Sequence, residues 1–191
     1  MQTTRHAPPP RCESARRRDV IAEAVALGVP RDYGRKRLMT AVREPRELAF
    51  IGIDVHDRPQ WLATRAARAF ARMHESARED RVTLDIVSAF RSADYQLGIL
   101  RAKRERGLSI AEILRVSAAP GYSEHHSGRA VDITTPGYAA LEEEFENSPA
   151  FAWLRRHAAR FGFALSYPRG NRHGIAYEPW HWCWHARRRG G

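Results

Sequence analysis

Hydrophobic positions recur at helical spacing between Arg58 and Arg78. The apolar residues lie three or four positions apart and arginines occupy the other side, which is the pattern of an amphipathic helix packed on a core. These residues are Leu62, Ala66, Ala69, Phe70, Met73 and Ala77. The pattern predicts one core-covering helix over residues 58–78. A shorter helix is predicted over residues 20–28, ending near Gly28 and Pro30.

Start signals predict three more helices. Ser92 precedes an apolar helical run, and Ser109-Ile-Ala-Glu112 has the spacing of a capping box. Ser148-Pro149 is a favourable helix start, because proline at the first helical position gives up an amide that would lack a partner. This last helix is expected to continue to Gly162.

Alternating or β-rich segments between the helices predict strands. They are Val82–Val87, Arg129–Ile133, Phe163–Tyr167 and Ile175–Trp182, the last two joined by the polar loop Pro168–Gly174. Strands and helices in this order predict an α+β fold, in which helices pack around a small antiparallel sheet. We assign residues 46–186 to this domain.

The two ends of the chain differ from the domain in composition. Residues 1–45 are predicted to be a basic N-terminal arm with a short helix, in part disordered, and residues 187–191 a basic tail. No segment has the roughly 18 apolar residues of a membrane span, and Met1–Asp19 lacks the apolar stretch of a secretory signal. The two cysteines, Cys12 and Cys183, define no disulfide framework.

The formal net charge is +10, and the basic residues are arginines apart from Lys36 and Lys103. Because the arginines are scattered along the chain, we attribute the charge to arginine bias and expect no nucleic-acid partner. The alternative is attraction to an anionic cell-wall polymer or to nucleic acid. A monomer is expected.

The densest polar cluster runs from Ser123 to Asp132, and His181 follows 49 residues later. A zinc hydrolase needs three His, Asp or Glu ligands and an open fourth position for water. His125, Asp132 and His181 meet that count, and Glu178 is the natural general base. Glu178 and His181 would face opposite sides of a regular strand, so Pro179 must mark a bulge or the entry to the strand.

These residues also carry a family resemblance. The pattern Ser123-x-His125-x-x-Gly128-x-Ala130-x-Asp132 with Glu178-x-x-His181-Trp182 resembles the VanY-like D-alanyl-D-alanine carboxypeptidases, which are zinc peptidases of bacterial peptidoglycan. The resemblance covers residues 50–185. Further matching segments are Ser88-x-Phe90-Arg91-Ser92, Gln96, Ala119–His125, Gly162-Phe163 and Ser166-Tyr167. After Trp182 the chain departs from the family pattern.

The resemblance implies functions for individual residues. It implies that His125, Asp132 and His181 bind Zn2+, that Glu178 is the catalytic base, and that Arg91 stabilises negative charge on the substrate, while Gln96 and Ser123 make lesser substrate contacts. The implied reaction releases the C-terminal D-alanine from a peptidoglycan stem peptide. L,D-carboxypeptidase and lytic endopeptidase activities on the same polymer remain alternatives. The family implies action in the periplasm or cell envelope, with the cytoplasm as the alternative for a chain without a visible signal.

Three other interpretations concern neighbouring residues. His126 is expected to be a surface or supporting residue, and Glu124 a solvated one. His181, Cys183 and His185 could form a different metal site if they lay on a helix. A non-catalytic binding module would require a closed site, with a fourth protein ligand such as His126, Cys183 or His185.

Overall fold

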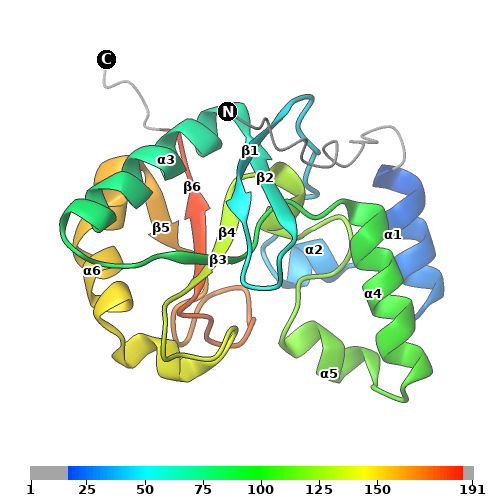
Figure 1. Cartoon of the computed structure of the whole chain (residues 1–191). Helices are drawn as coiled ribbons and strands as arrows, with labels where there is room; N and C mark the ends of the chain where they lie inside the picture. The colour runs from blue at the N-terminus through cyan, green and yellow to red at the C-terminus, as the bar shows by residue number, and fades with distance from the viewer. Residues whose placement is uncertain (1–16, 187–191) are drawn as a thin grey trace.

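A four-stranded antiparallel sheet forms the centre of the molecule, whose computed structural model describes residues 17–186. Its strands lie in the order β3 (Asp85–Ser88), β4 (Ala130–Thr134), β6 (His181–Trp184) and β5 (Phe163–Leu165). All five residues of β4 are buried, so both faces of this strand are covered. Helices surround the sheet (Figure 1), which confirms the predicted α+β fold.

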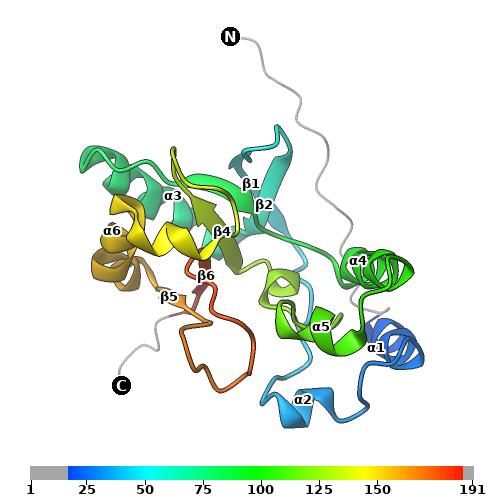
Figure 2. The same ribbon diagram turned by 90° about the horizontal axis from the view of Figure 1, so that it is seen from below.

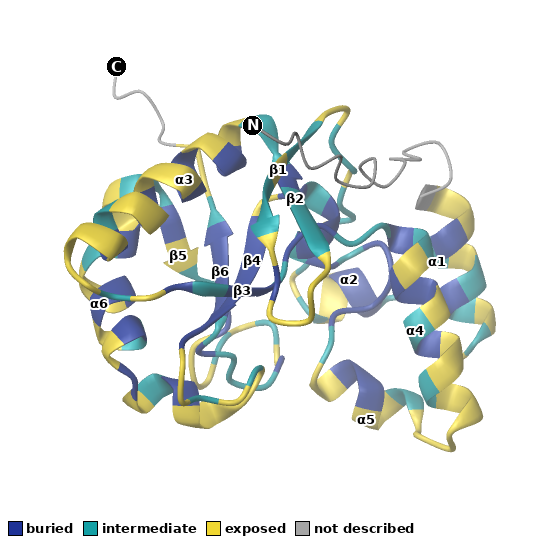
Figure 3. Cartoon of the chain, viewed as in Figure 1, coloured by how far each residue is buried: buried dark blue, intermediate teal, exposed yellow. Residues whose placement is uncertain are grey.

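One face of the sheet packs on α3 (Thr64–Glu79) and α6 (Pro149–His157). Val131 and Ile133 alternate with Asp132 along β4 and enter this core, because successive strand residues point to opposite faces. The helices contribute Phe70, Met73, Trp153 and Leu154. Five of the six buried positions of α3 are periodic positions expected from the sequence, and the sixth is Ala67. The outer face of the helix is exposed (Figure 3). Two 3-10 helices, η3 (Glu143–Asn147) and η4 (Ala158–Phe161), flank α6.

A β-hairpin replaces the predicted first turns of the long helix. Strands β1 (Leu48–Ile53) and β2 (Pro59–Ala63) pair antiparallel, and α3 begins only at Thr64, so the expected start at residue 58 was wrong. The Asp54 carboxylate closes the turn by accepting hydrogen bonds from the backbone amides of His56 and Arg58, at 2.8 and 3.0 Å. Leu62 is fully buried, but it belongs to strand β2 and not to the helix.

Four helices form a second group with a core of their own. They are α1 (Arg17–Ala26), α2 (Tyr33–Lys36), α4 (Ala93–Glu105) and α5 (Ile110–Arg115). Their core contains Val20, Tyr33, Leu97, Leu100 and Leu114. In Figure 2 this group lies to one side of the four-stranded sheet. The division of the chain at residue 45 stays a prediction. The parts of the predicted N-terminal arm and C-terminal tail at residues 1–16 and 187–191 lie outside the described residues.

The predicted helix caps are present. Ser92 accepts a hydrogen bond from the Tyr95 amide at 3.1 Å, Ser109 and Glu112 form the capping box, and Ser148 accepts from the Phe151 amide at 3.0 Å. Each satisfies an amide that the first turn of a helix leaves free.

The last strand is shorter than expected. β6 begins at His181, not at Ile175, because Pro179 has no amide to donate to a strand partner and the chain turns there. The His181 amide donates to the Glu178 carbonyl at 3.1 Å across this turn. Pro179 therefore does mark the strand entry. Within residues 17–186, none of the helices has the length and apolar character that crossing a membrane requires.

Candidate metal centre and pocket

Strand register brings three polar residues into one row across the sheet. Asp132 on β4 lies directly opposite His181 on β6 and opposite Ser88 on β3. Directly opposed residues of an antiparallel pair project to the same face with their Cβ atoms about 5 Å apart. Two residues 49 positions apart in the sequence thereby become neighbours on the face opposite the α3 and α6 core.

His125 reaches the same place from the 3-10 helix η2 (Glu124–Ser127). Ser123 caps this helix, and Gly128 ends it with a positive φ of 63°. A Cβ atom at Gly128 would lie 2.8 Å from the Ala63 backbone nitrogen, so glycine is required for this tight turn into β4. Gly128 thus turns the chain from η2 into β4.

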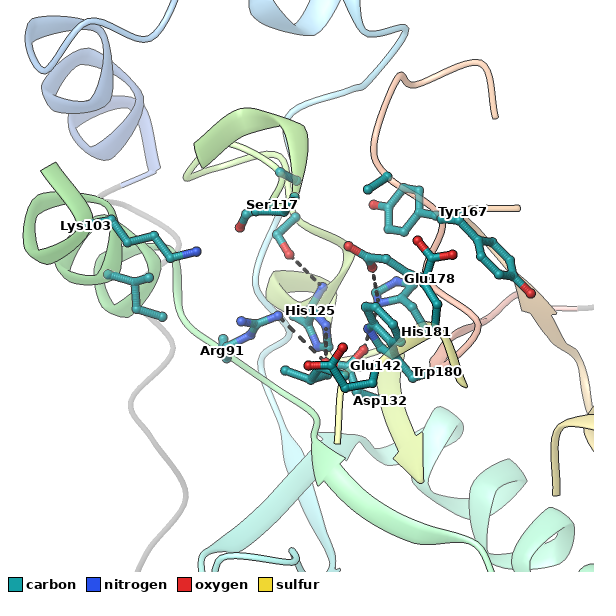
Figure 4. Close-up of a pocket in the computed structure, with 18 residues that line it drawn as sticks. Arg91, Lys103, Ser117, His125, Asp132, Glu142, Tyr167, Glu178, Trp180 and His181 are labelled. Carbon is teal, nitrogen blue, oxygen red and sulfur yellow. Dashed lines mark hydrogen bonds and ion pairs between the residues drawn. The ribbon is translucent and has the colours of Figure 1, made fainter. Parts of the chain in front are cut away.

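The three side chains converge closely enough to hold a metal ion. His125 Nε2 lies 3.2 Å from Asp132 Oδ2, and His181 Nδ1 lies 3.0 Å from Asp132 Oδ1. All three residues are buried, and their ligand atoms lie within 4.8 Å of one another (Figure 4). Two imidazole nitrogens and one carboxylate oxygen form a donor set that suits a first-row divalent metal such as zinc.

Each candidate ligand is held by a hydrogen bond to a neighbouring group. His125 Nδ1 lies 2.6 Å from the Ala89 carbonyl, His181 Nε2 lies 2.9 Å from Glu124 Oε2, and Ser88 donates to Asp132 Oδ2. Such partners fix the ring orientation and tautomer of metal-binding histidines. The donor set and its supports therefore fit a metal site.

Glu124 is one of these supports, and its expected place on a solvated face was wrong. Its side chain is 29% exposed and its carboxylate faces the buried His181 ring. Although burial opposes the shift, contact with His181 lowers the pKa of Glu124 to about 2. No sequence pattern predicts this contact, because it joins η2 to β6 through tertiary structure alone.

The charges at the centre are strongly coupled. Burial and the nearby Arg91 guanidinium lower the pKa of His125 to about 4. Against the effect of burial, hydrogen bonds to Asp132 and Glu124 raise the pKa of His181 to about 10. Burial would raise the pKa of Asp132, but contacts with the two histidines hold it well below its usual value. Without a metal, a positive charge on His181 is thus stabilised where a metal cation would sit.

Glu178 stands beside this centre in the turn before β6. Its Oε2 lies 3.7 Å from His181 Nδ1, and the side chain is 13% exposed. Burial raises the pKa of Glu178 to about 7. The negative charge of Asp132 adds to this effect, and the positive charge of His181 opposes it. A carboxyl group with a pKa near neutrality can both accept and return a proton.

Arg91 approaches from the opposite side, in the loop between β3 and α4. Its Nη2 lies 4.0 Å from Asp132 Oδ2, and its buried Nε has no hydrogen-bond partner among the described residues. His126 holds the backbone here: its Nδ1 lies 2.7 Å from the Arg91 carbonyl, and its Nε2 accepts from the Gly121 amide at 3.2 Å. His126 is fully buried and supports Arg91 rather than binding a metal.

A pocket of about 420 Å3 opens above these residues, between the helical group and the sheet. Besides the three candidate ligands, Arg91, Ser123 and Glu178 line it. Gln96 does not line it, although the sequence placed it with the substrate contacts. It is buried in α4, and its Nε2 donates to Ser117 Oγ at 2.8 Å and to the Ala118 carbonyl at 3.3 Å. Tyr167, from one of the segments that match the family, also lines the pocket. Lys103 and Ser117 line it as well, and neither was proposed as a site residue from the sequence.

Cys183 and His185 do not join the three candidate ligands. β6 is a strand, so the helical arrangement considered for His181 and His185 is absent. Instead, Glu124, Cys183 and His185 form a second group whose ligand atoms lie within 4.8 Å of one another. The buried thiol and the exposed imidazole lie beyond Glu124, outside the pocket.

Three candidate metal ligands in a pocket, with a carboxylate beside them and an arginine opposite, have the arrangement of a metallohydrolase site. The family model for VanY, described as D-alanyl-D-alanine carboxypeptidase, matches residues 59–187. The chain therefore belongs to the VanY family of D-alanyl-D-alanine carboxypeptidases.

Individual relatives agree with this assignment. A D-alanyl-D-alanine carboxypeptidase of Enterococcus faecalis is 31% identical over 120 residues, which are 58% of this chain and 43% of that protein. The chain spans 45% and 43% of the lengths of two curated relatives that it matches.

Solved structures show the same fold. The LdcB LD-carboxypeptidase superposes with a TM-score of 0.67 at 27% identity, covering 76% of this chain and 71% of that one. A mutant of the vancomycin resistance D,D-pentapeptidase VanY, from a VanB-type cassette and in complex with Zn(II), gives a TM-score of 0.54 at 25% identity. That match covers 72% of this chain and 79% of the other.

Proposed function

We propose that this protein is a zinc-dependent carboxypeptidase that removes the C-terminal D-alanine from peptidoglycan stem peptides. The observation that carries the proposal is the convergence of His125, Asp132 and His181 beside Glu178 in one pocket. Membership of the VanY family supports the substrate class. A Zn(II) complex of a related structure and the donor set itself support zinc as the metal.

His125, Asp132 and His181 would hold the zinc ion through two nitrogens and a carboxylate oxygen. When bound, the ion supplies a Lewis acid for the scissile carbonyl and lowers the pKa of water to about 7. Glu178 then takes the proton of the attacking water on a carboxylate oxygen and returns it to the leaving amine.

Arg91 stabilises the negative charge that develops on the substrate carbonyl oxygen. Its guanidinium is near the centre, and the unpartnered Nε and the Nη atoms are donors in a fixed geometry. Ser123, the cap of η2, borders the pocket and would contact the substrate. Gln96 acts indirectly, because it orients Ser117 instead of facing the pocket.

An L,D-carboxypeptidase is the second candidate, favoured by the TM-score of 0.67 with LdcB. The two activities differ in the residue before the scissile bond. Zinc-loaded protein is therefore incubated with a pentapeptide stem ending in D-alanyl-D-alanine and with the tetrapeptide that ends in one D-alanine. We expect mass spectrometry to show D-alanine release from the pentapeptide, and release from the tetrapeptide alone would select the second candidate.

Glu178→Ala tests the assigned base. We expect kcat to fall by at least about 100-fold, because general base catalysis contributes roughly 10²–10⁴ in rate. Zinc content should be unchanged. Glu144→Ala, which removes an exposed carboxylate outside the pocket, is the matched control and should retain full turnover. Equal turnover by the Glu178→Ala variant would refute the assignment.

A further inference from the structure

The pocket walls carry opposite charges. Among the described residues that line it, the only arginine and lysine are Arg91 and Lys103, whereas the acidic residues apart from Asp132 are Glu142, Glu143 and Glu178. Figure 4 shows Lys103 and Arg91 on one side of the candidate metal ligands and Glu178 and Tyr167 on the other. An anionic group of a ligand is therefore attracted to the side formed by α4 and the loop before it.

Lys103 is a half-buried cation without a counter-charge. It lies on α4 one turn after Ile99, which lines the same pocket, and its side chain extends toward the pocket interior. The described residues provide no hydrogen-bond or ion-pair partner for its ammonium group. Burial and the positive charges of Arg106 and Arg91 lower the pKa of Lys103. A buried, unpaired charge is unfavourable, and a bound anion would relieve this.

Ser117 offers a neutral donor on the same wall. The Ala118 carbonyl can only accept, so the atom of Gln96 that faces it must be the amide nitrogen, which also donates to Ser117 Oγ at 2.8 Å. Because Ser117 Oγ accepts that bond, its own proton remains available. Ser117 lines the pocket together with Lys103, so its hydroxyl can donate to a ligand there.

We propose that Lys103 and Ser117 bind the free C-terminal carboxylate of the substrate, while Arg91 faces the scissile carbonyl. The inference rests on the proposed function and decides between two forms of it. A peptide that continues past the scissile bond has a neutral amide where a carboxypeptidase substrate has a carboxylate. Lys103 and Ser117 thus make the protein an exopeptidase and disfavour cleavage within a peptide.

Binding is measured by calorimetry with zinc-loaded Glu178→Ala protein, which removes the base and so prevents turnover. The ligands are a stem pentapeptide with a free C-terminal carboxylate and the same peptide with a C-terminal amide. We expect Lys103→Met to raise the Kd of the peptide acid about tenfold, because one charge-assisted hydrogen bond is lost. The Kd of the peptide amide should change by no more than about twofold. Lys103→Arg should restore part of the loss, because it keeps the charge.

Ser117→Ala should raise the Kd of the peptide acid but not that of the amide, and by a smaller factor than Lys103→Met does. Lys36→Met is the matched control: Lys36 is the other lysine of the chain, is exposed on α2 and pairs with Asp32 at 3.3 Å. It should change neither Kd. Thermal melts of each variant check that the fold is intact.

Two results would overturn the assignment of Lys103: an unchanged Kd for the acid in the Lys103→Met variant, or an equal loss of affinity for acid and amide. Both are independent of catalysis. Absence of D-alanine release by the wild-type protein would instead refute the proposed function, and the binding measurement would still decide whether Lys103 recognises a carboxylate.

Discussion

At the scale of single residues, Glu124 shows how a residue outside the ligand set can control it. Its carboxylate accepts from His181 Nε2 at 2.9 Å and leaves Nδ1 directed at Asp132. Holding the proton on Nε2 gives Nδ1 the free lone pair that a metal needs. Glu124 therefore selects the tautomer of His181 in which the ring can be a ligand.

Glu124→Ala is expected to weaken zinc binding by about 10- to 100-fold, which is typical for loss of a hydrogen-bond partner of a metal ligand. Competition with a chromogenic chelator measures the affinity. Glu124→Gln should lose less, since its amide oxygen can still accept from the imidazole. Glu144→Ala should bind zinc as the wild type does, and the same affinity in the Glu124→Ala variant would show that His181 needs no such partner.

At the scale of elements, the β1–β2 hairpin supports the candidate metal centre through a chain of hydrogen bonds. Gln60 Nε2 donates to Asp54 Oδ2 at 2.7 Å, and Gln60 Oε1 accepts from the Ala89 amide at 2.9 Å. The carbonyl of Ala89 in turn holds His125. The hairpin that the helical periodicity concealed thus fixes the end of β3 where one candidate ligand is anchored.

Asp54→Asn is expected to destabilise the protein by about 1–3 kcal/mol at pH 7, through weakened hydrogen bonds to a buried carboxylate. Against the effect of burial, hydrogen bonds from Arg58 and His56 lower the pKa of Asp54 in the folded protein. A lowered pKa contributes stability that is present above the unfolded pKa of about 3.9 and is lost as the pH falls through the folded value.

The difference in unfolding free energy between wild type and Asp54→Asn should therefore shrink below about pH 3.9. Urea melts of the metal-free proteins across pH 2–7 measure it. Asp57→Asn is the control: this residue lies in the same turn, is exposed, and has a positive φ of 60° that asparagine tolerates. A difference that stays constant down to pH 2 would contradict the role given to the Asp54 charge.

At the scale of the whole molecule, two hydrophobic cores flank the pocket and neither includes a candidate metal ligand. One contains α3, α6 and the sheet, and the other α1, α2, α4 and α5. The residues that line the pocket come from both sides: Ile99 and Lys103 from α4, and Asp132 and His181 from the sheet. We therefore expect the fold to form without a metal, and a metal bound between the two groups to stabilise it.

We expect the metal-free protein to keep its far-UV circular dichroism, and zinc at about 100 times its Kd to add about 2.7 kcal/mol of stability. For a chain of this size that corresponds to a rise in Tm of roughly 5–10 °C. A double variant, His125→Ala with His181→Ala, should show no such rise. Unfolding on removal of zinc would mean that the site is structural.

The sequence by itself determined the local features. Caps at Ser92, Ser109 and Ser148 and the strand entry at Pro179 depend on bonds between near neighbours, so the residue types at those positions suffice to predict them. The spacing of His125, Asp132, Glu178 and His181, with the family resemblance, was enough to nominate the site.

Tertiary structure decided what depends on register and on contacts between distant segments. The pairing of Asp132 with His181, the contact of Glu124 with His181, and the wall formed by Lys103 and Ser117 join residues from different elements. A periodic pattern states which face of an element is apolar, but it does not state which partner that element meets. The hairpin was missed for the same reason, because Asp54 closes its turn through side-chain bonds that the apolar spacing of residues 58–78 does not reveal.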